Sequence, residues 1–304
     1  MIKVLQAAAV LTVVFSFATG LDIRHHSVEL FSHFRLQYFA VSLLLLIAFA
    51  FLMHYAWAAA LLVTVFFNAS FVLPWYVSDA PTATGTPLKL MHANVYSGNR
   101  QYDRLLALVE LEKPDLVFLQ EVTPEWLAGT QPLLEGYPYT YAEPSTGNFG
   151  IAVFSRIPFS EVRHVASPPL GYPTLIATVM VDAEPLTVIS SHPTIPMGGP
   201  LYEARNDQLQ SVADLVREER GKLVLLGDFN ASTWDRHFRQ LEVSTGLMSV
   251  RRGFGVLPTW PTFLPFAMIP IDHALVSDGI SVVDARTGTR IGSDHLPLIV
   301  TLAL

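Results

Sequence analysis

The chain has 304 residues, of which 51% are hydrophobic and 15% are charged, and it contains no cysteine. The absence of cysteine excludes disulfides, catalysis by a thiolate and zinc sites built from thiolates. The formal net charge is −7, and residues 81–304 carry all of it. The first 80 residues are neutral overall, since their basic and acidic side chains balance: Lys3, Arg24, Arg35, Asp22, Glu29 and Asp79.

The N-terminal part is apolar enough to be a membrane anchor. Residues 36–78 contain no Lys, Arg, Asp or Glu, and this run of 43 residues is about twice what one helix needs to cross a bilayer. We therefore predict two spans at 36–54 and 56–77, with Trp75 and Tyr76 at the membrane interface. Residues 3–21 predict a third span, or alternatively a cleaved signal peptide. Buried helices of a soluble domain are the remaining interpretation.

The number of spans determines the predicted orientation. Three spans that begin inside place everything after residue 80 outside the cytoplasm, and so does a cleaved signal peptide followed by two spans. The sequence thus predicts a multi-pass protein of a bacterial-type inner (cytoplasmic) membrane, with its C-terminal domain extracytoplasmic or periplasmic. Arg24 and Arg35 oppose this orientation, because basic residues favour the cytoplasmic side.

Residues 79–87 are rich in small residues and proline and predict a linker to a domain at 88–304. Apolar runs predict strands in this domain, and helical spacing predicts helices between them. Strands are expected at 88–94, 115–121, 149–156, 174–181, 186–191, 223–226, 272–277 and 296–302, and helices at 102–111, 124–134 and 201–220. This order predicts an α/β fold, a four-layered α/β sandwich in which two mixed β-sheets pack face to face with helices outside.

Polar residues recur where the predicted strands end. Asp228 and Asn230 follow an apolar run, and in extended backbone two residues at this spacing point to the same side. Open α/β sheets usually place their active sites at the carboxyl ends of strands. The other strand-end residues are Asn94, Glu121, His192, Asp272, Asp294 and His295. Each alone could be a turn or solvent-facing residue, but their recurrence predicts one shared site.

The motifs around these residues resemble the endonuclease/exonuclease/phosphatase superfamily, which includes deoxyribonuclease I-like nucleases and sphingomyelinases. The motifs are HAN, LQEV, GDFN and GSDHLP, and the resemblance covers about 88–304. The tight N-terminal hairpin and the TWP motif at 259–261 resemble a membrane-anchored bacterial branch that includes relatives of the teicoplanin-resistance protein VanJ. The resemblance implies the same four-layered sandwich, preceded here by transmembrane helices.

The resemblance also implies a divalent metal site. Glu121 would be the principal ligand of Mg²⁺ or Mn²⁺, which prefer oxygen ligands. Asn94 would support that site or hold a phosphate oxygen of the substrate. Asp294 would bring a second carboxylate near the ion.

A catalytic set follows from the same resemblance. Asp228 and Asn230 would orient the attacking water and contact the phosphoryl oxygens. His295 would be the central imidazole, with Asp272 fixing its tautomer. His192 would protonate the leaving oxygen, or else be an ordinary loop histidine. The reaction would be in-line attack of water on a phosphodiester or phosphomonoester.

Two classes of substrate stay open. Anchorage at a bilayer favours a lipid-linked phosphate, and the sequence has no cluster of Lys and Arg of the kind that non-specific DNA or RNA binding requires, although this does not exclude a nuclease. Trp260, Phe263 and Phe266 lie in a loop that could bind acyl chains or cap the sandwich. The alternative outside the enzymes is an inactive, membrane-tethered binding module, and no protein partner can be inferred.

Two further histidines are assigned no catalytic role. His273 follows Asp272 in a strand and should face the opposite side, so we expect it to be structural. His92 precedes Asn94 by two residues, where it could line the mouth of the site, but nothing in the motif calls for it.

Overall fold

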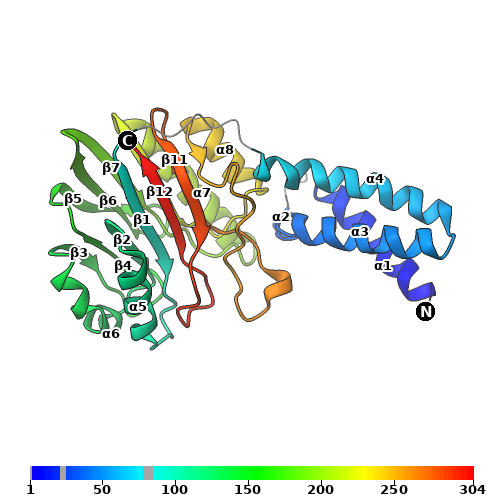
Figure 1. The fold of residues 1–304 in the computed structure, drawn as a ribbon, viewed down its shortest axis with the longest axis horizontal. Helices are drawn as coiled ribbons and strands as arrows, with labels where there is room; N and C mark the ends of the chain where they lie inside the picture. The colour runs from blue at the N-terminus through cyan, green and yellow to red at the C-terminus, as the bar shows by residue number, and fades with distance from the viewer. Residues whose placement is uncertain (1, 21–24, 78–84) are drawn as a thin grey trace.

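Two β-sheets pack face to face in the computed structural model, which describes residues 2–20, 25–77 and 85–304 (Figure 1). The first sheet has six strands in the order β11-β12-β1-β2-β4-β3, and the second has six in the order β5-β6-β7-β8-β10-β9. The first comprises β1 (Pro87–Asn94), β2 (Leu116–Gln120), β3 (Tyr139–Glu143), β4 (Ile151–Ser155), β11 (Ser281–Thr287) and β12 (Leu298–Ala303). The second comprises β5 (Phe159–Ser167), β6 (Tyr172–Val181), β7 (Glu184–Ser190), β8 (Lys222–Asp228), β9 (Met248–Ser249) and β10 (Asp272–Val276).

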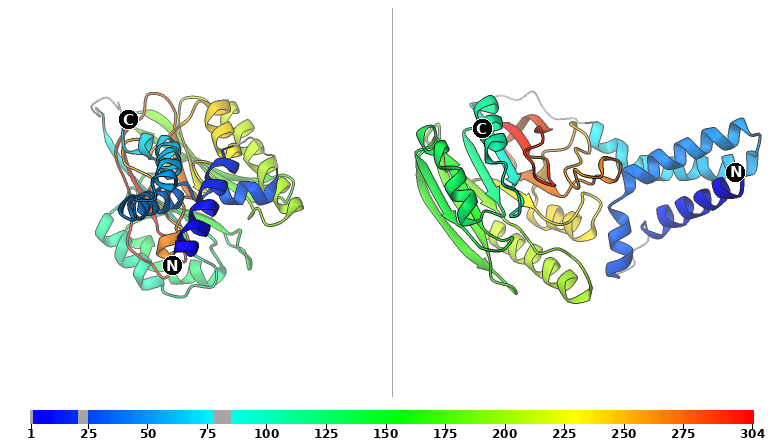
Figure 2. Two further views of the ribbon diagram at one scale, coloured as in Figure 1. Left: turned by 90° about the vertical axis from the view of Figure 1, so that its right-hand side faces the viewer. Right: turned by 90° about the horizontal axis from the view of Figure 1, so that it is seen from below.

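Both sheets are mixed, because β1 runs parallel to β2 and β7 runs parallel to β8, while the other neighbours are antiparallel. Helices cover the two outer faces, as the view from below in Figure 2 shows for α7, drawn in yellow-green. The helices of this domain are α5 (Tyr102–Glu112), α6 (Pro124–Gly129), α7 (Gly199–Glu218) and α8 (Arg236–Thr245), with short 3₁₀ turns η2 (Gln131–Glu135) and η3 (Pro265–Ala267). The predicted four-layered α/β sandwich is confirmed.

Burial on both faces of the sheets explains the uninterrupted apolar run in β8. Val224 and Leu226 point into the core between the sheets, where they join Phe118 of β2. Leu223 and Leu225 point the other way and pack with α7 and α8. A strand covered on both sides carries no polar alternation, which is why such a strand is visible in the sequence.

Four strands of the structure have no counterpart among the predicted elements: β3, β5, β9 and β11. Each of them is the edge strand at one end of a sheet. Helix α8 was not predicted either, and the helix predicted at 124–134 is interrupted at Thr130, where α6 ends and η2 begins. The observed strands of the sheet interiors lie within two residues of their predicted bounds.

The N-terminal helices project from one end of the sandwich (Figure 1). They are α1 (Ile2–Ala18), α2 (His26–Ser32), α3 (Arg35–Phe51) and α4 (Tyr55–Val72), followed by the 3₁₀ turn η1 (Leu73–Tyr76). The helices predicted at 36–54 and 56–77 correspond to α3 and α4, and the turn between them lies at 52–54. The predicted helix 3–21 ends at Ala18, and α2 is an element that the apolar pattern did not predict.

One helix among the described residues, Tyr55–Tyr76, is long and apolar enough by itself to cross a membrane. α2 and α3 together would make a second such stretch, bent by 63°, whereas α1 is shorter. These are properties of length and composition, so the three-span anchor and its orientation stay predictions. The predicted linker at 79–87 lies outside the described residues up to 84, and its last residue, Pro87, already begins β1.

The helices are packed against the sandwich. Trp234 Nε1 donates a hydrogen bond to the carbonyl oxygen of Phe71 at 3.0 Å, and the N–H of Gly255 donates to the carbonyl of Trp75 at 2.8 Å. Trp75, Trp234 and Val256 form a small apolar cluster at this junction. The N-terminal part therefore shares an interface with the sandwich rather than meeting it only through the chain connection.

Candidate active site

A close backbone approach sets the position of Asp228. The preceding Gly227 has φ +148°, and a Cβ there would stand 1.9 Å from the carbonyl oxygen of Ser191, just after β7. Glycine alone tolerates this contact and this backbone conformation. The strand then presents Asp228 directly opposite Asp272 in the antiparallel register of β8 and β10. Both carboxylates are buried.

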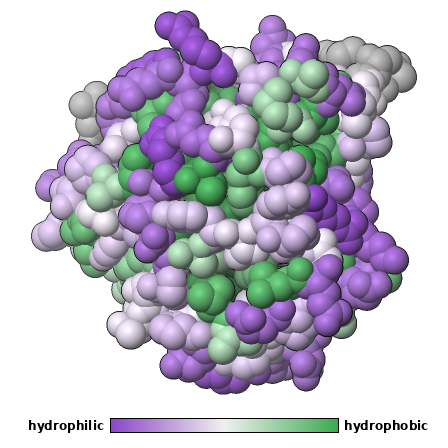
Figure 3. All heavy atoms as spheres, turned by 90° about the vertical axis from the view of Figure 1, so that its left-hand side faces the viewer, coloured by the Kyte–Doolittle hydropathy of each residue, from purple (hydrophilic) through white to green (hydrophobic). Residues whose placement is uncertain are grey.

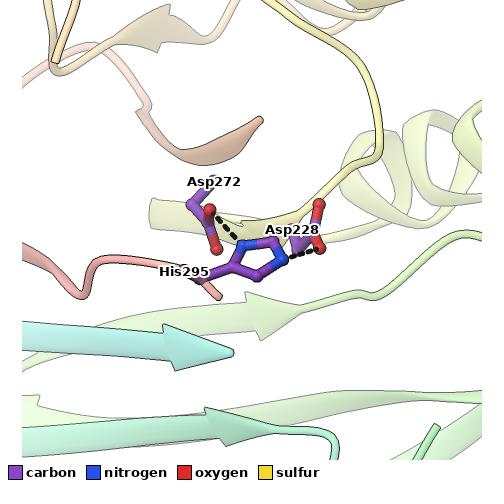
Figure 4. Close-up of side chains that lie close together, drawn as sticks. All are labelled: Asp228, Asp272 and His295. Carbon is purple, nitrogen blue, oxygen red and sulfur yellow. Dashed lines mark hydrogen bonds and ion pairs between the residues drawn. The ribbon is translucent and has the colours of Figure 1, made fainter. Parts of the chain in front are cut away.

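His295 lies between these two carboxylates, as Figure 4 shows. Its Nδ1 is 2.8 Å from Asp272 Oδ2, and its Nε2 is 3.6 Å from Asp228 Oδ2. The ring comes from the loop between β11 and β12, where the N–H of His295 donates to Ser293 Oγ at 3.0 Å. Burial alone would lower the pKa of His295, but the charges of Asp272 and Asp228 outweigh it and raise the pKa to about 10. The imidazole is therefore protonated at neutral pH.

Asp272 contacts a second histidine, His92, through its other carboxylate oxygen. His92 Nε2 lies 3.0 Å from Asp272 Oδ1. Burial opposes the ionisation of Asp272, but the interactions with His295 and His92 hold its pKa well below the usual range. His92 therefore belongs to the site, although the sequence motif gave it no role.

Asn94 and Glu121 emerge side by side, because β1 and β2 are parallel neighbours that end together. Asn94 Nδ2 donates to Glu121 Oε1 at 3.0 Å and to Asp228 Oδ2 at 3.1 Å. The N–H of Ser97 donates to Glu121 Oε2 at 2.9 Å. Glu121 is buried and has φ +62°, a left-handed conformation that is costly for a non-glycine residue and is often found at functional sites.

Gln120 of β2 links the two sheets at the site through side-chain hydrogen bonds. The sequence pattern did not predict this role. Its Nε2 donates to the carbonyl of Ser191 at 2.9 Å, and its Oε1 accepts from the N–H of Asp228 at 2.9 Å. The sequence does contain a signal for it, because Gln120 is a polar residue in an otherwise apolar strand and is adjacent to the predicted site residue Glu121.

His192 and Asn230 complete the wall around Asp228. His192 Nε2 lies 3.6 Å from Asp228 Oδ2, and burial lowers the pKa of His192. Asn230 has φ +49°, so β8 has already ended and the extended-strand argument for this residue is wrong. Instead, the N–H of Asn230 donates to Asp228 Oδ1 at 2.9 Å, and its Nδ2 donates to the carbonyl of Pro193 at 3.0 Å.

Asp294 and Trp260 form the opposite rim. Trp260 Nε1 donates to Asp294 Oδ2 at 3.0 Å, which holds this half-buried carboxylate beside His295. The aromatic loop around Trp260 does not cap the sandwich as a whole, since Phe263 and Phe266 are 71% and 77% exposed.

A cavity of about 280 Å³ opens over these residues. All the predicted site residues except Asn94 and Asp272 line it, and these two contact residues that do. The rest of the wall is mostly apolar and includes two residues of the N-terminal helical part, Leu30 and His33. The other lining residues are Tyr96, Asn148, Ile195, Pro196, Met197, Ile269 and Ile271.

The sequence model of the endonuclease/exonuclease/phosphatase family matches residues 91–295. The chain belongs to this family. The predicted hydrolase acting on phosphate ester bonds is thereby confirmed at the level of the reaction class. A search of the curated proteins found no match to the sequence.

Solved structures share the fold of this family member at low sequence identity. One is TDP2 of D. rerio in complex with a single-strand DNA product, with TM-score 0.62 and 19% identity, covering 72% of this chain and 100% of that chain. The endonuclease/exonuclease/phosphatase of Beutenbergia cavernae has TM-score 0.59 and 23% identity, covering 72% of each chain. The 3′ phosphatase NExo of Neisseria, bound to a product DNA hairpin, has TM-score 0.60 and 21% identity, covering 70% of this chain and 98% of that chain.

Proposed function

We propose that this chain is a membrane-anchored, divalent-metal-dependent phosphoesterase that hydrolyses a lipid-linked phosphate ester by in-line attack of water. The observation that carries the proposal is the convergence of Glu121, Asp228 and His295 at one cavity, with Asn94 bonded to the first two. These residues come from the ends of three strands and from one loop. The proposal is also supported by the family of the chain, whose members hydrolyse phosphate esters.

The donors around Glu121 suit a hard divalent cation such as Mg²⁺ or Mn²⁺. Glu121 is buried and accepts hydrogen bonds from Asn94 and Ser97. Because it has no basic partner within the described ranges, a bound cation would balance its negative charge. Asp294 offers a second carboxylate on the rim. A bound ion would neutralise charge on the phosphoryl group.

Another acidic group is a poorer metal site. Ligand atoms of Asp228, Asp272 and His295 lie within 4.8 Å of one another. However, both ring nitrogens of His295 face carboxylates, and its raised pKa keeps the ring positively charged. A cation would have to displace a proton held by two carboxylates, which is why we assign the metal to Glu121.

The roles of the remaining residues follow from their contacts. Burial raises the pKa of Asp228 to about 6, which suits a group that takes a proton from the attacking water near neutral pH. Protonated His295 would stabilise the negative charge that develops on the phosphoryl group and donate a proton to the leaving oxygen. Because burial lowers the pKa of His192, we assign this ring a hydrogen-bonding role rather than the proton donation suggested by the motif.

The walls of the cavity favour a lipid-linked ester over a nucleic acid. Among the residues that the structure describes, no Lys or Arg lines the cavity, whereas a nucleic-acid groove uses such residues to neutralise backbone phosphates. Ile195 and Met197 are exposed at its edge. A second candidate, a nuclease acting on DNA or RNA, is favoured by the two DNA-bound structures that share the fold.

Exposed apolar side chains support the membrane anchor. Leu44, Phe51 and Phe66 on α3 and α4 are among many large apolar side chains that face outward from the N-terminal helices. At the opposite end of the molecule polar and apolar residues are interspersed, as Figure 3 shows. An outward apolar surface of this kind is stable in contact with lipid.

The proposal is tested with the purified full chain and bis(4-nitrophenyl) phosphate in the presence of Mg²⁺ or Mn²⁺. We expect turnover that is lost with a chelator and falls at least about a hundredfold in Asp228→Asn and Glu121→Gln. Asp278→Asn, at the exposed opposite end of β10, is the control and should be unaffected. Turnover that survives chelation, or that is equal in all variants, would refute the metal-dependent mechanism.

A further inference from the structure

A buried ion-pair network fixes α2 on the catalytic domain. Glu29 of α2 pairs with Arg205 of α7, which also pairs with Asp235 at 3.2 Å, and Tyr202 donates to Glu29 Oε2 at 2.7 Å. Arg205 and Asp235 are completely buried. Removing one partner would leave buried polar or charged groups without a hydrogen bond, so these contacts hold α2 in one place.

The same network reaches the active site. Arg205 donates from Nη1 to the carbonyl oxygen of Asn230 at 2.9 Å, so one guanidinium binds both α2 and a residue of the cavity wall. His33, in the turn after α2, hydrogen bonds through Nδ1 to Ser232 Oγ at 2.9 Å. The position of α2 is therefore tied to the loop that follows β8.

This placement brings α2 into the wall of the cavity. Leu30 and His33 line it together with the apolar side chains of Ile195 and Met197. Leu30 is 38% exposed and makes none of the polar contacts that hold α2. A partly exposed leucine on an otherwise anchored helix is available to contact a ligand.

We propose that α2 is the substrate-selecting wall of the active site, and that Leu30 binds the hydrocarbon chain of a lipid-linked phosphate ester beside the reacting phosphate. This inference rests on the proposed phosphoesterase function and deepens it. The N-terminal part then acts as a component of the binding site in addition to anchoring the chain.

The surroundings of α2 identify the occupant as a membrane lipid. α2 leads directly into α3, whose Gln37 donates from Nε2 to the carbonyl of Met268 at 2.7 Å, in the loop that exposes Phe263 and Phe266. An apolar residue of the cavity wall, on a helix that leads directly into the predicted span α3, suits a ligand whose hydrocarbon chain remains partly in the bilayer. Within the described ranges no Lys or Arg lines the cavity, which disfavours a nucleic acid in the same place.

The test measures binding of two phosphonates, which cannot be hydrolysed, to the full chain in lipid nanodiscs with Mg²⁺, subtracting the signal of empty nanodiscs. We expect octylphosphonate to bind at least about tenfold more tightly than methylphosphonate, because each methylene buried against Leu30 and its neighbours favours binding. Leu30→Asn should remove most of this preference. Leu30→Met, which keeps an apolar side chain, should retain it.

The matched control is Leu134→Asn on η2, because Leu134 is also a leucine and is 39% exposed, against 38% for Leu30. Equal affinity of the wild type for the two phosphonates, or an unchanged preference in Leu30→Asn, would overturn the inference. If the wild type binds octylphosphonate more tightly than methylphosphonate but hydrolyses no phosphate ester, the proposed function is overturned instead. The two failures are therefore distinguishable.

Discussion

His92 and Asp272 form a buried contact in which His92 Nε2 lies 3.0 Å from Asp272 Oδ1, the oxygen that His295 does not use. The carboxylate is thus held from both sides by imidazoles. This arrangement restricts rotation of Asp272 and, through it, the orientation of the His295 ring. His92 is therefore a positioning residue that acts on the reacting groups through Asp272.

Replacing His92 with leucine should lower kcat for a phosphate ester about tenfold and change KM less than about twofold, because a hydrogen bond to a charged group contributes roughly 1.5–3 kcal/mol. His92→Gln keeps a side-chain donor and should recover most of kcat. His164→Leu, at a half-exposed histidine of β5, is the control for a surface imidazole. Steady-state kinetics check this, and equal kcat in the leucine and glutamine variants would contradict the positioning role.

The two-residue spacing of extended backbone fails for Asp228 and Asn230 but holds for His92 and Asn94. The sequence pattern predicts Asp228 and Asn230 as same-side neighbours in extended backbone, but the chain turns at Asn230, whose N–H donates a local hydrogen bond to Asp228 Oδ1. His92 and Asn94 do lie two apart within β1, and both reach the site. Whether a strand continues past a Gly-Asp pair depends on tertiary packing, which the residue pattern alone does not contain.

Gly227→Ala should destabilise the protein by more than about 2 kcal/mol, since the added Cβ would collide with the carbonyl of Ser191 on top of an unfavourable φ of +148°. Gly279→Ala is the matched control: it has φ +81° but no atom within 4 Å of the new Cβ, so it should cost only about 1 kcal/mol. Thermal unfolding followed by circular dichroism measures both. Equal losses would show that the close approach to Ser191 contributes nothing.

The strands that the sequence pattern did not predict lie at the edges of the two sheets. β5 carries Glu161, Arg163 and His164 within one strand, because one of its sides has no neighbouring strand and part of its surface meets solvent. Polar residues at an edge also discourage pairing with other chains. The interior strands that carry the site residues are apolar runs and were predictable. The contribution of α2 to the cavity depends on contacts with α7 that are remote in sequence, and no local pattern predicted it.

His273 faces away from Asp272, as expected for its neighbour in a strand, and is enclosed by Phe229 and Phe238, with Nε2 donating to the carbonyl of Ala231 at 2.7 Å. Burial, with a smaller contribution from Arg251, lowers the pKa of His273 to about 3. The folded value lies below the ordinary value of 6.5, so below pH 6.5 the unfolded chain binds a proton that the folded chain excludes.

Stability linked to His273 is therefore complete above pH 6.5 and is lost progressively as the pH falls towards 3. Between pH 7.5 and pH 5 this single group should cost the wild type about 2 kcal/mol of unfolding free energy. His273→Gln keeps a donor for Ala231 but does not titrate, so its unfolding free energy should fall less over the same interval, by about that amount. Denaturant unfolding at the two pH values measures the difference, and parallel losses in both proteins would mean that the buried ring is protonated in the folded state.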